Sequence, residues 1–125
     1  MKNPKIQVSF QGRILWAEFM DKAVISAADI EEMYTFAEGK AKGNKYCVMF
    51  EAIDHFDVTE DGLEFMLNNP HDKNVLAKVY IIGTQEAKVK TKLHLLFDQP
   101  ELKPATFKTS REGLDHLKSI VEKSR

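Results

Sequence analysis

The sequence has 125 residues, of which 43% are hydrophobic and 30% are charged, and its formal net charge is −1. A chain of this length fits one domain with a single hydrophobic core, and we expect that domain to span residues 1–125. The near-neutral charge gives no electrostatic basis for binding nucleic acid, which usually requires a strongly basic face.

A single cysteine, Cys47, excludes an internal disulfide and a thiolate zinc cluster. It lies in the apolar run KYCVMFEA, which indicates a buried thiol that packs as a small hydrophobic side chain. The N-terminal segment MKNPKIQVSF lacks the apolar stretch of a signal peptide, and no run approaches the roughly 20 apolar residues of a membrane span. We therefore expect a cytoplasmic protein that does not span a membrane.

Hydrophobic periodicity predicts a hairpin, a helix and a buried strand in the first half of the chain. The segment KIQVSFQGRILWAEF alternates apolar and polar residues on both sides of Gln11-Gly12, which predicts two strands. SAADIEEMYTFAEGKAKG has apolar residues at helical spacing, with Ser26 as the expected N-cap, Asp29 as its capping partner and Gly43 as the stop. The run KYCVMFEAI predicts a strand covered on both faces.

Strands and helices alternate in the second half. VTEDGLEFMLNN predicts a helix with Leu63, Met66 and Leu67 on its inward face. VLAKVYIIG predicts a second buried strand, TQEAKVKTKLHLLFDQ a third helix, ATFKT a short strand and SREGLDHLKSIVEKSR a closing helix. This order predicts an α/β domain with a mostly parallel, five-stranded sheet, opened by a hairpin and flanked by four helices. Ligands usually bind outside the carboxyl ends of such strands, which directs attention to Ala52–Thr59 and Gly83–Glu86.

The order of elements, together with VYIIGTQEAKVKTKLHLLF and PATFKTSREGLDHL, resembles SpoIIAA-like proteins of the STAS-like group. More narrowly, the chain is similar to small bacterial STAS-like proteins, with a looser likeness to CRAL-TRIO lipid-binding domains. The resemblance covers nearly the whole chain. It implies a SpoIIAA-like fold and a non-enzymatic, regulatory role in protein–protein interaction, like that of anti-sigma-factor antagonists.

In this family a kinase partner phosphorylates a serine at the start of the helix after the central strand, within a pattern like Asp-Ser-Ser-Gly-Leu. The matching stretch is TEDGL, in which Gly62-Leu63 anchors the comparison. The two serines then fall on Glu60 and Asp61, which cannot accept phosphate, and Thr59 falls on the aspartate. The resemblance therefore implies a module without the phospho-serine switch.

The acidic residues of FDVTEDGLEF allow three interpretations. Thr59 as N-cap, with Glu60 and Asp61 in the first turn, is typical of a helix start. The carboxylates also suit a partner-binding surface that imitates a permanently phosphorylated state, and a general acid/base pair is the third alternative. The candidate interaction surface comprises Asp54, His55, Asp57, Thr59, Glu60, Asp61, Gly83 and Thr84.

Other side chains give weaker indications. The four histidines lack metal-ligand spacing, and no nucleophile motif occurs, so we expect no catalytic, metal or cofactor site. The aromatic residues either fill the core or line a pocket for a small apolar or lipid-like ligand, and periodicity does not separate the two. An unpaired sheet edge near the hairpin would allow a homodimer.

Overall fold

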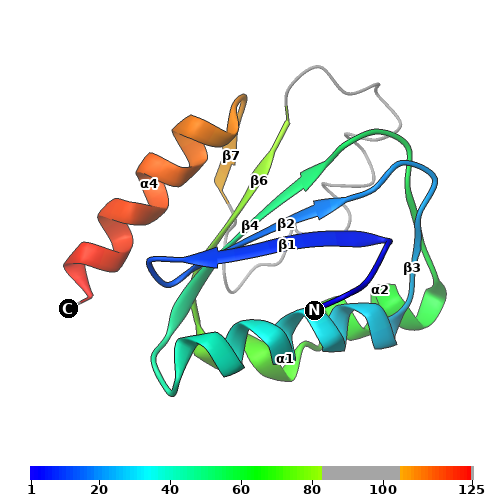
Figure 1. Cartoon of the computed structure of the whole chain (residues 1–125), viewed down its shortest axis with the longest axis horizontal. Coiled ribbons are helices and arrows are strands. Elements are labelled where there is room, and N and C mark those ends of the chain that lie inside the picture. Colours follow the sequence, from blue (N-terminus) through cyan, green and yellow to red (C-terminus); the bar gives the residue numbers. More distant parts are fainter. Residues whose placement is uncertain (83–104, 125) are drawn as a thin grey trace.

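The computed structural model describes residues 1–82 and 105–124. Its main sheet has the strand order β1-β2-β4-β6-β7, in which β1 is antiparallel to β2 and the other three pairings are parallel (Figure 1). The strands are β1 (Ile6–Gln11), β2 (Ile14–Phe19), β4 (Tyr46–Ala52), β6 (Val75–Ile81) and β7 (Ala105–Phe107). The sheet is thus mixed, and its five strands and opening hairpin are those that the sequence predicts.

The hairpin closes with a two-residue turn. Gly12 and Arg13 have φ angles of +59° and +63°, and Gln11 pairs with Ile14 across the turn. Positive φ at both central residues is the type I′ geometry, whose twist matches that of the flanking strands. The sequence predicted the junction at Gln11-Gly12, and the two turn residues are Gly12 and Arg13, one position later.

Three α-helices cover the two faces of the sheet in the described part of the chain. Helices α1 (Ala27–Ala41) and α2 (Glu60–Leu67) lie against one face, and α4 (Ser110–Lys123) lies against the other (Figure 1). Alternate residues of β4 point to opposite faces of the sheet: Val48 and Phe50 face α1, while Cys47 and Met49 face α4. Both faces of β4 are buried, as its apolar run predicts. The fourth predicted helix, residues 84–99, lies outside the described residues.

The start of α1 confirms the predicted capping box. The Ser26 hydroxyl accepts from the Asp29 N–H at 3.3 Å, and the Ser26 N–H donates to the Asp29 carboxylate at 2.9 Å. At the other end, Lys42 and Gly43 adopt left-handed φ angles of +51° and +86°, which ends the helix.

The inward face of α2 differs from the predicted one. Gly62 and Met66 are buried, whereas Leu63 and Leu67 are 38% and 63% exposed, so the prediction is confirmed for Met66 and wrong for the two leucines. Gly62 allows the helix backbone to approach the neighbouring strand closely. That approach turns the Gly62–Met66 side inward and leaves the leucines outside.

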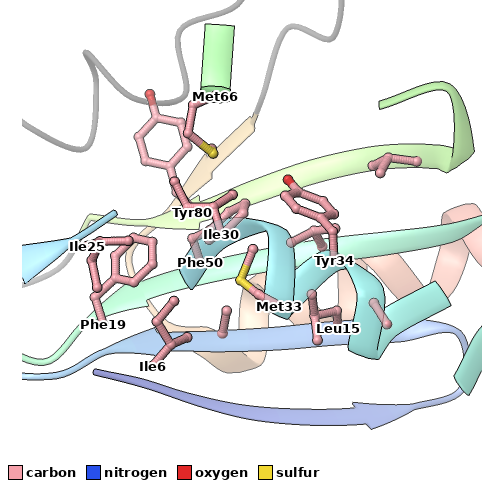
Figure 2. Packing of buried hydrophobic residues seen from close by; sticks show 14 of the residues in the cluster. Ile6, Leu15, Phe19, Ile25, Ile30, Met33, Tyr34, Phe50, Met66 and Tyr80 are labelled. Carbon is pink, nitrogen blue, oxygen red and sulfur yellow. The ribbon is translucent and has the colours of Figure 1, made fainter. Parts of the chain in front are cut away.

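The aromatic side chains of the described residues mainly fill the core. Phe19 lies between Phe50 and Phe56, with ring centroids 5.8 and 5.1 Å apart, and all three side chains are at most 3% exposed. Figure 2 shows Phe19, Phe50 and Tyr34 packed among the aliphatic residues between the sheet and α1. These rings therefore belong to the hydrophobic core. That other aromatic residues line a pocket for a small apolar or lipid-like ligand stays a prediction.

No described helix combines the length and the low polarity that crossing a membrane requires.

Candidate functional site

The predicted interaction surface lies at the carboxyl end of β4, where two loops are joined by backbone hydrogen bonds. Lys22 N–H donates to the His55 carbonyl at 2.6 Å, and Asp57 N–H donates to Ala23 at 2.9 Å. Strands β3 (Val24–Ile25) and β5 (Asp57–Val58) pair in parallel as a separate two-stranded sheet. This ladder, which two-residue strands are too short to signal in a sequence, holds the acidic turn in one conformation.

Thr59 begins α2 as predicted. Its side-chain oxygen accepts from the Gly62 N–H at 3.2 Å, and the hydroxyl also contacts the Asp61 carboxylate. Glu60 and Asp61 occupy the first turn, where the helix dipole stabilises negative charge. The cap interpretation is therefore confirmed, and the Thr59 hydroxyl is engaged in the native fold.

Gly62 is required by the close approach of α2 to β3. A β-carbon at this position would lie 2.8 Å from Val58 Cγ1 and 3.0 Å from the Ile25 carbonyl oxygen. We expect Gly62→Ala to lower the free energy of unfolding by about 1–3 kcal/mol, the usual cost of overpacking.

Gly39→Ala in α1 is the matched control, because nothing lies within 4 Å of the added β-carbon. It should leave stability unchanged or raise it by up to about 1 kcal/mol through helix propensity. Urea denaturation measures both variants, and equal effects would refute the close-approach explanation.

Most polar side chains of the turn face solvent. Asp54, His55, Asp57, Glu60 and Asp61 are exposed, and His55 Nε2 lies 3.8 Å from an Asp54 oxygen. A carboxyl that acts as a general acid at neutral pH normally sits in an apolar pocket, which this exposure does not provide. Gly83 and Thr84, the remaining members of the predicted surface, lie outside the described residues.

Exposed apolar residues accompany these acids. Among the described residues, the large hydrophobic side chains left exposed are Val24, Ile53, Leu63 and Leu67, between 38% and 63%. Val24 pairs with Asp57, Ile53 precedes Asp54, and Leu63 follows Asp61 by two residues. We call the acids Asp54, Asp57, Glu60 and Asp61, together with Val24, Ile53 and Leu63, the acidic–apolar surface. Exposed apolar side chains accompanied by polar ones are the composition of many protein interfaces.

A second polar cluster, which the sequence does not reveal, surrounds His71 in the 3-10 helix η1 (Pro70–Asn74). His71 Nδ1 lies 3.0 Å from Glu38, and Nε2 lies 2.8 Å from Glu31. Its ring stacks on Tyr34, with centroids 5.2 Å apart and 3° between planes. Burial by itself lowers the pKa of His71, but hydrogen bonds and charge from Glu31 and Glu38 raise it above its ordinary value. Glu31 and Glu38 therefore stabilise the protonated form of the His71 ring relative to its neutral form.

Glu38 organises this cluster. Its carboxylate also accepts from the Tyr46 hydroxyl at 3.1 Å and from Asn74 Nδ2 at 2.9 Å. Burial raises its pKa, but the hydrogen bonds from Asn74, His71 and Tyr46 outweigh burial and lower it overall. Because Glu38 of α1 binds partners from β4 and η1, we assign the cluster a structural role that fixes η1 to the core.

A carboxylate pair lies on the face of the sheet opposite α1. Glu18 of β2 and Glu51 of β4 are register partners. Burial and the nearby charge of Glu18 raise the pKa of Glu51. In residues 1–82 and 105–124, no group of three or more potential ligands is placed to hold a metal ion.

Comparison with known proteins supports the fold. No protein-family model matches the sequence, and no curated protein matches it. The chain is similar to the crystal structure of an uncharacterised protein of the DUF3478 family from Shewanella loihica PV-4, which has a SpoIIAA-like fold. The identity is 16%, the TM-score is 0.56, and the match covers 90% of this chain and 91% of that one. The chain thus has the α/β, SpoIIAA-like fold that the resemblance implied, and at this identity the likeness concerns the fold alone.

Proposed function

We propose that this chain, which has the SpoIIAA-like fold, is a non-enzymatic module that binds a protein partner through the acidic–apolar surface. The observation that carries the proposal is the coincidence of four exposed carboxylates with Val24, Ile53 and Leu63 on a turn fixed by backbone hydrogen bonds. A fixed turn loses little conformational entropy when it binds, which favours affinity.

The composition of the surface indicates the chemistry of its partner. The negative charge of Asp54, Asp57, Glu60 and Asp61 favours a basic surface, since complementary charge accelerates encounter and excludes acidic competitors. The exposed apolar side chains would bury against apolar residues at the centre of the interface. Carboxylates at positions 60 and 61 support a module whose binding does not depend on phosphorylation.

Photo-crosslinking in the native cells tests this proposal. A photoreactive phenylalanine analogue at Leu63 is expected to give a discrete adduct with one protein, and Glu60→Lys together with Asp57→Lys should abolish that adduct. The same analogue at Lys118, exposed on α4, is the control and should give no such adduct. Adducts that are absent at Leu63, or that persist after charge reversal, would contradict the proposal.

A further inference from the structure

Strand β1 forms one edge of the main sheet and has outward-facing backbone groups. Met20 N–H donates to the Lys5 carbonyl at 3.0 Å, so the backbone C=O group of Lys5 points towards β2. Residues alternate between the two orientations in an antiparallel pair. Gln7, Ser9 and Gln11 therefore face β2, whereas the N–H and C=O groups of Val8 and Phe10 point away from the sheet.

Within the described part of the chain, strand β1 itself carries none of the features that usually protect a sheet edge against strand pairing. Edge strands are normally blunted by charges, proline, bulges or short length. The six residues IQVSFQ contain no charge and no proline, and their pairing with β2 is regular. The opposite edge, β7, has only three residues and is followed by Lys108. An open groove of about 480 Å³ lies beside the start of β1, lined largely by Met1, Pro4, Ile6, Val8 and Met20.

We propose that β1 pairs antiparallel with β1 of a second copy of this chain, with Val8 opposite Val8 on the two-fold axis. In this register the two Val8 residues exchange N–H···O=C bonds, and each Phe10 N–H meets the Ile6 carbonyl of the other copy. The pairing would join the two sheets into one. It involves no residue of the acidic–apolar surface, so it stands independently of the proposed function.

The sequence of β1 is complementary to itself in this register. Ile6 lies opposite Phe10 on the α1 side of the sheet, and Gln7 lies opposite Ser9 on the other side, where both are exposed. Lys5 falls opposite Gln11, so no two like charges face each other. A two-fold interface must be compatible with its own copy, and an uncharged strand meets that requirement.

Charge placement at Gln7 and Ser9 tests the pairing by sedimentation equilibrium over a range of concentrations. Wild type should associate to a dimer. Gln7→Lys with Ser9→Lys sets two lysine pairs opposite each other across the axis and should raise the dimer dissociation constant roughly tenfold. Gln7→Lys with Ser9→Glu places opposite charges across the same positions and should keep or tighten the dimer. Both positions are exposed, and thermal melts verify that each variant folds.

Amide hydrogen exchange supplies a second measurement. The Val8 and Phe10 N–H groups should become protected as wild-type concentration rises, and this protection should be lost in the double-lysine variant. A wild type that stays monomeric at every concentration would overturn the proposal. Equal dimerisation of both charge variants would also overturn it, because the contact would then lie elsewhere.

Discussion

Asp72→Ala is expected to lower the free energy of unfolding by about 3–5 kcal/mol, the usual effect of removing one partner from a buried ion pair. Lys78 Nζ lies 2.6 Å from an Asp72 oxygen, and the Lys78 side chain is only 2% exposed. Burial already lowers the pKa of Lys78, although Asp72 opposes this shift. Without Asp72, the ammonium group would be left in the core beside the Tyr34 ring, with no counter-ion among residues 1–82 and 105–124.

Replacing the lysine instead of the aspartate should lower the free energy of unfolding by less. In Lys78→Met the buried ammonium group is gone and the methionine fills most of its aliphatic space. The Asp72 side chain is 23% exposed overall, so its charge is less desolvated than that of Lys78, although the oxygen that faces position 78 stays buried without a partner. The double variant Asp72→Ala, Lys78→Met should therefore recover most of the stability that Asp72→Ala loses. Urea denaturation of the four proteins gives the double-mutant cycle.

The pH dependence of Asp72→Ala provides an independent check. A buried lysine with a depressed pKa binds fewer protons in the folded state than in the unfolded state, so stability rises with pH between the two pKa values. The deficit of Asp72→Ala should shrink as the pH is raised towards about 10, the ordinary range of lysine. A deficit independent of pH, or a double variant no more stable than Asp72→Ala, would show that Lys78 does not carry the effect.

Local patterns in the sequence predicted much of the fold. The Ser26–Asp29 capping box is a four-residue signal that depends on no distant contact. The continuous apolar run of β4 predicted burial on both faces, because a strand in the middle of a layered sheet has no polar side. The Thr59 cap was predictable for the same local reason.

Features that depend on distant residues were not predictable. The inward side of α2 is set by contact of Gly62 with Ile25, which lies 37 positions earlier, and eight residues give too little periodicity to show it. His71 is 33 and 40 positions from its two glutamates, so no spacing signals the cluster. In the candidate site the acids and the Thr59 cap were predicted, whereas the exposure of Leu63 and the β3–β5 ladder were not.

Wild-type stability is expected to fall as the pH rises above about 6.5, and His71 is the cause we assign. Glu31 and Glu38 of α1 contact its two ring nitrogens, while Tyr34 stacks on the ring and Phe65 of α2 lies beside it. The pKa of His71 is raised in the folded state. Between the unfolded value of about 6.5 and the folded value, the native protein binds more protons, so each pH unit removes up to about 1.4 kcal/mol.

Glu38 sets the lower limit of this window. Its folded pKa is lowered, so its contribution is present above the ordinary value for glutamate and is lost as the pH falls through the folded pKa. The cluster should therefore stabilise the fold most between about pH 4.5 and 6.5. Below this window, protonation of Glu38 removes one of the two anionic partners of His71. Above it, deprotonation of His71 removes the positive charge that Glu31 and Glu38 both contact.

Urea denaturation across this range, with NMR titration of the His71 ring, separates His71 from other titrating groups. His71→Gln keeps a side-chain amide near the glutamates but cannot titrate, so its stability should lose the fall above about pH 6.5. His116→Gln is the matched control, because His116 is exposed on α4 and contacts Phe107, remote from the glutamates. If His71→Gln kept the wild-type slope while His116→Gln lost it, the ion pairs of His71 would not govern stability. Loss of slope in His71→Gln alone would show that η1 is held to α1 by charge.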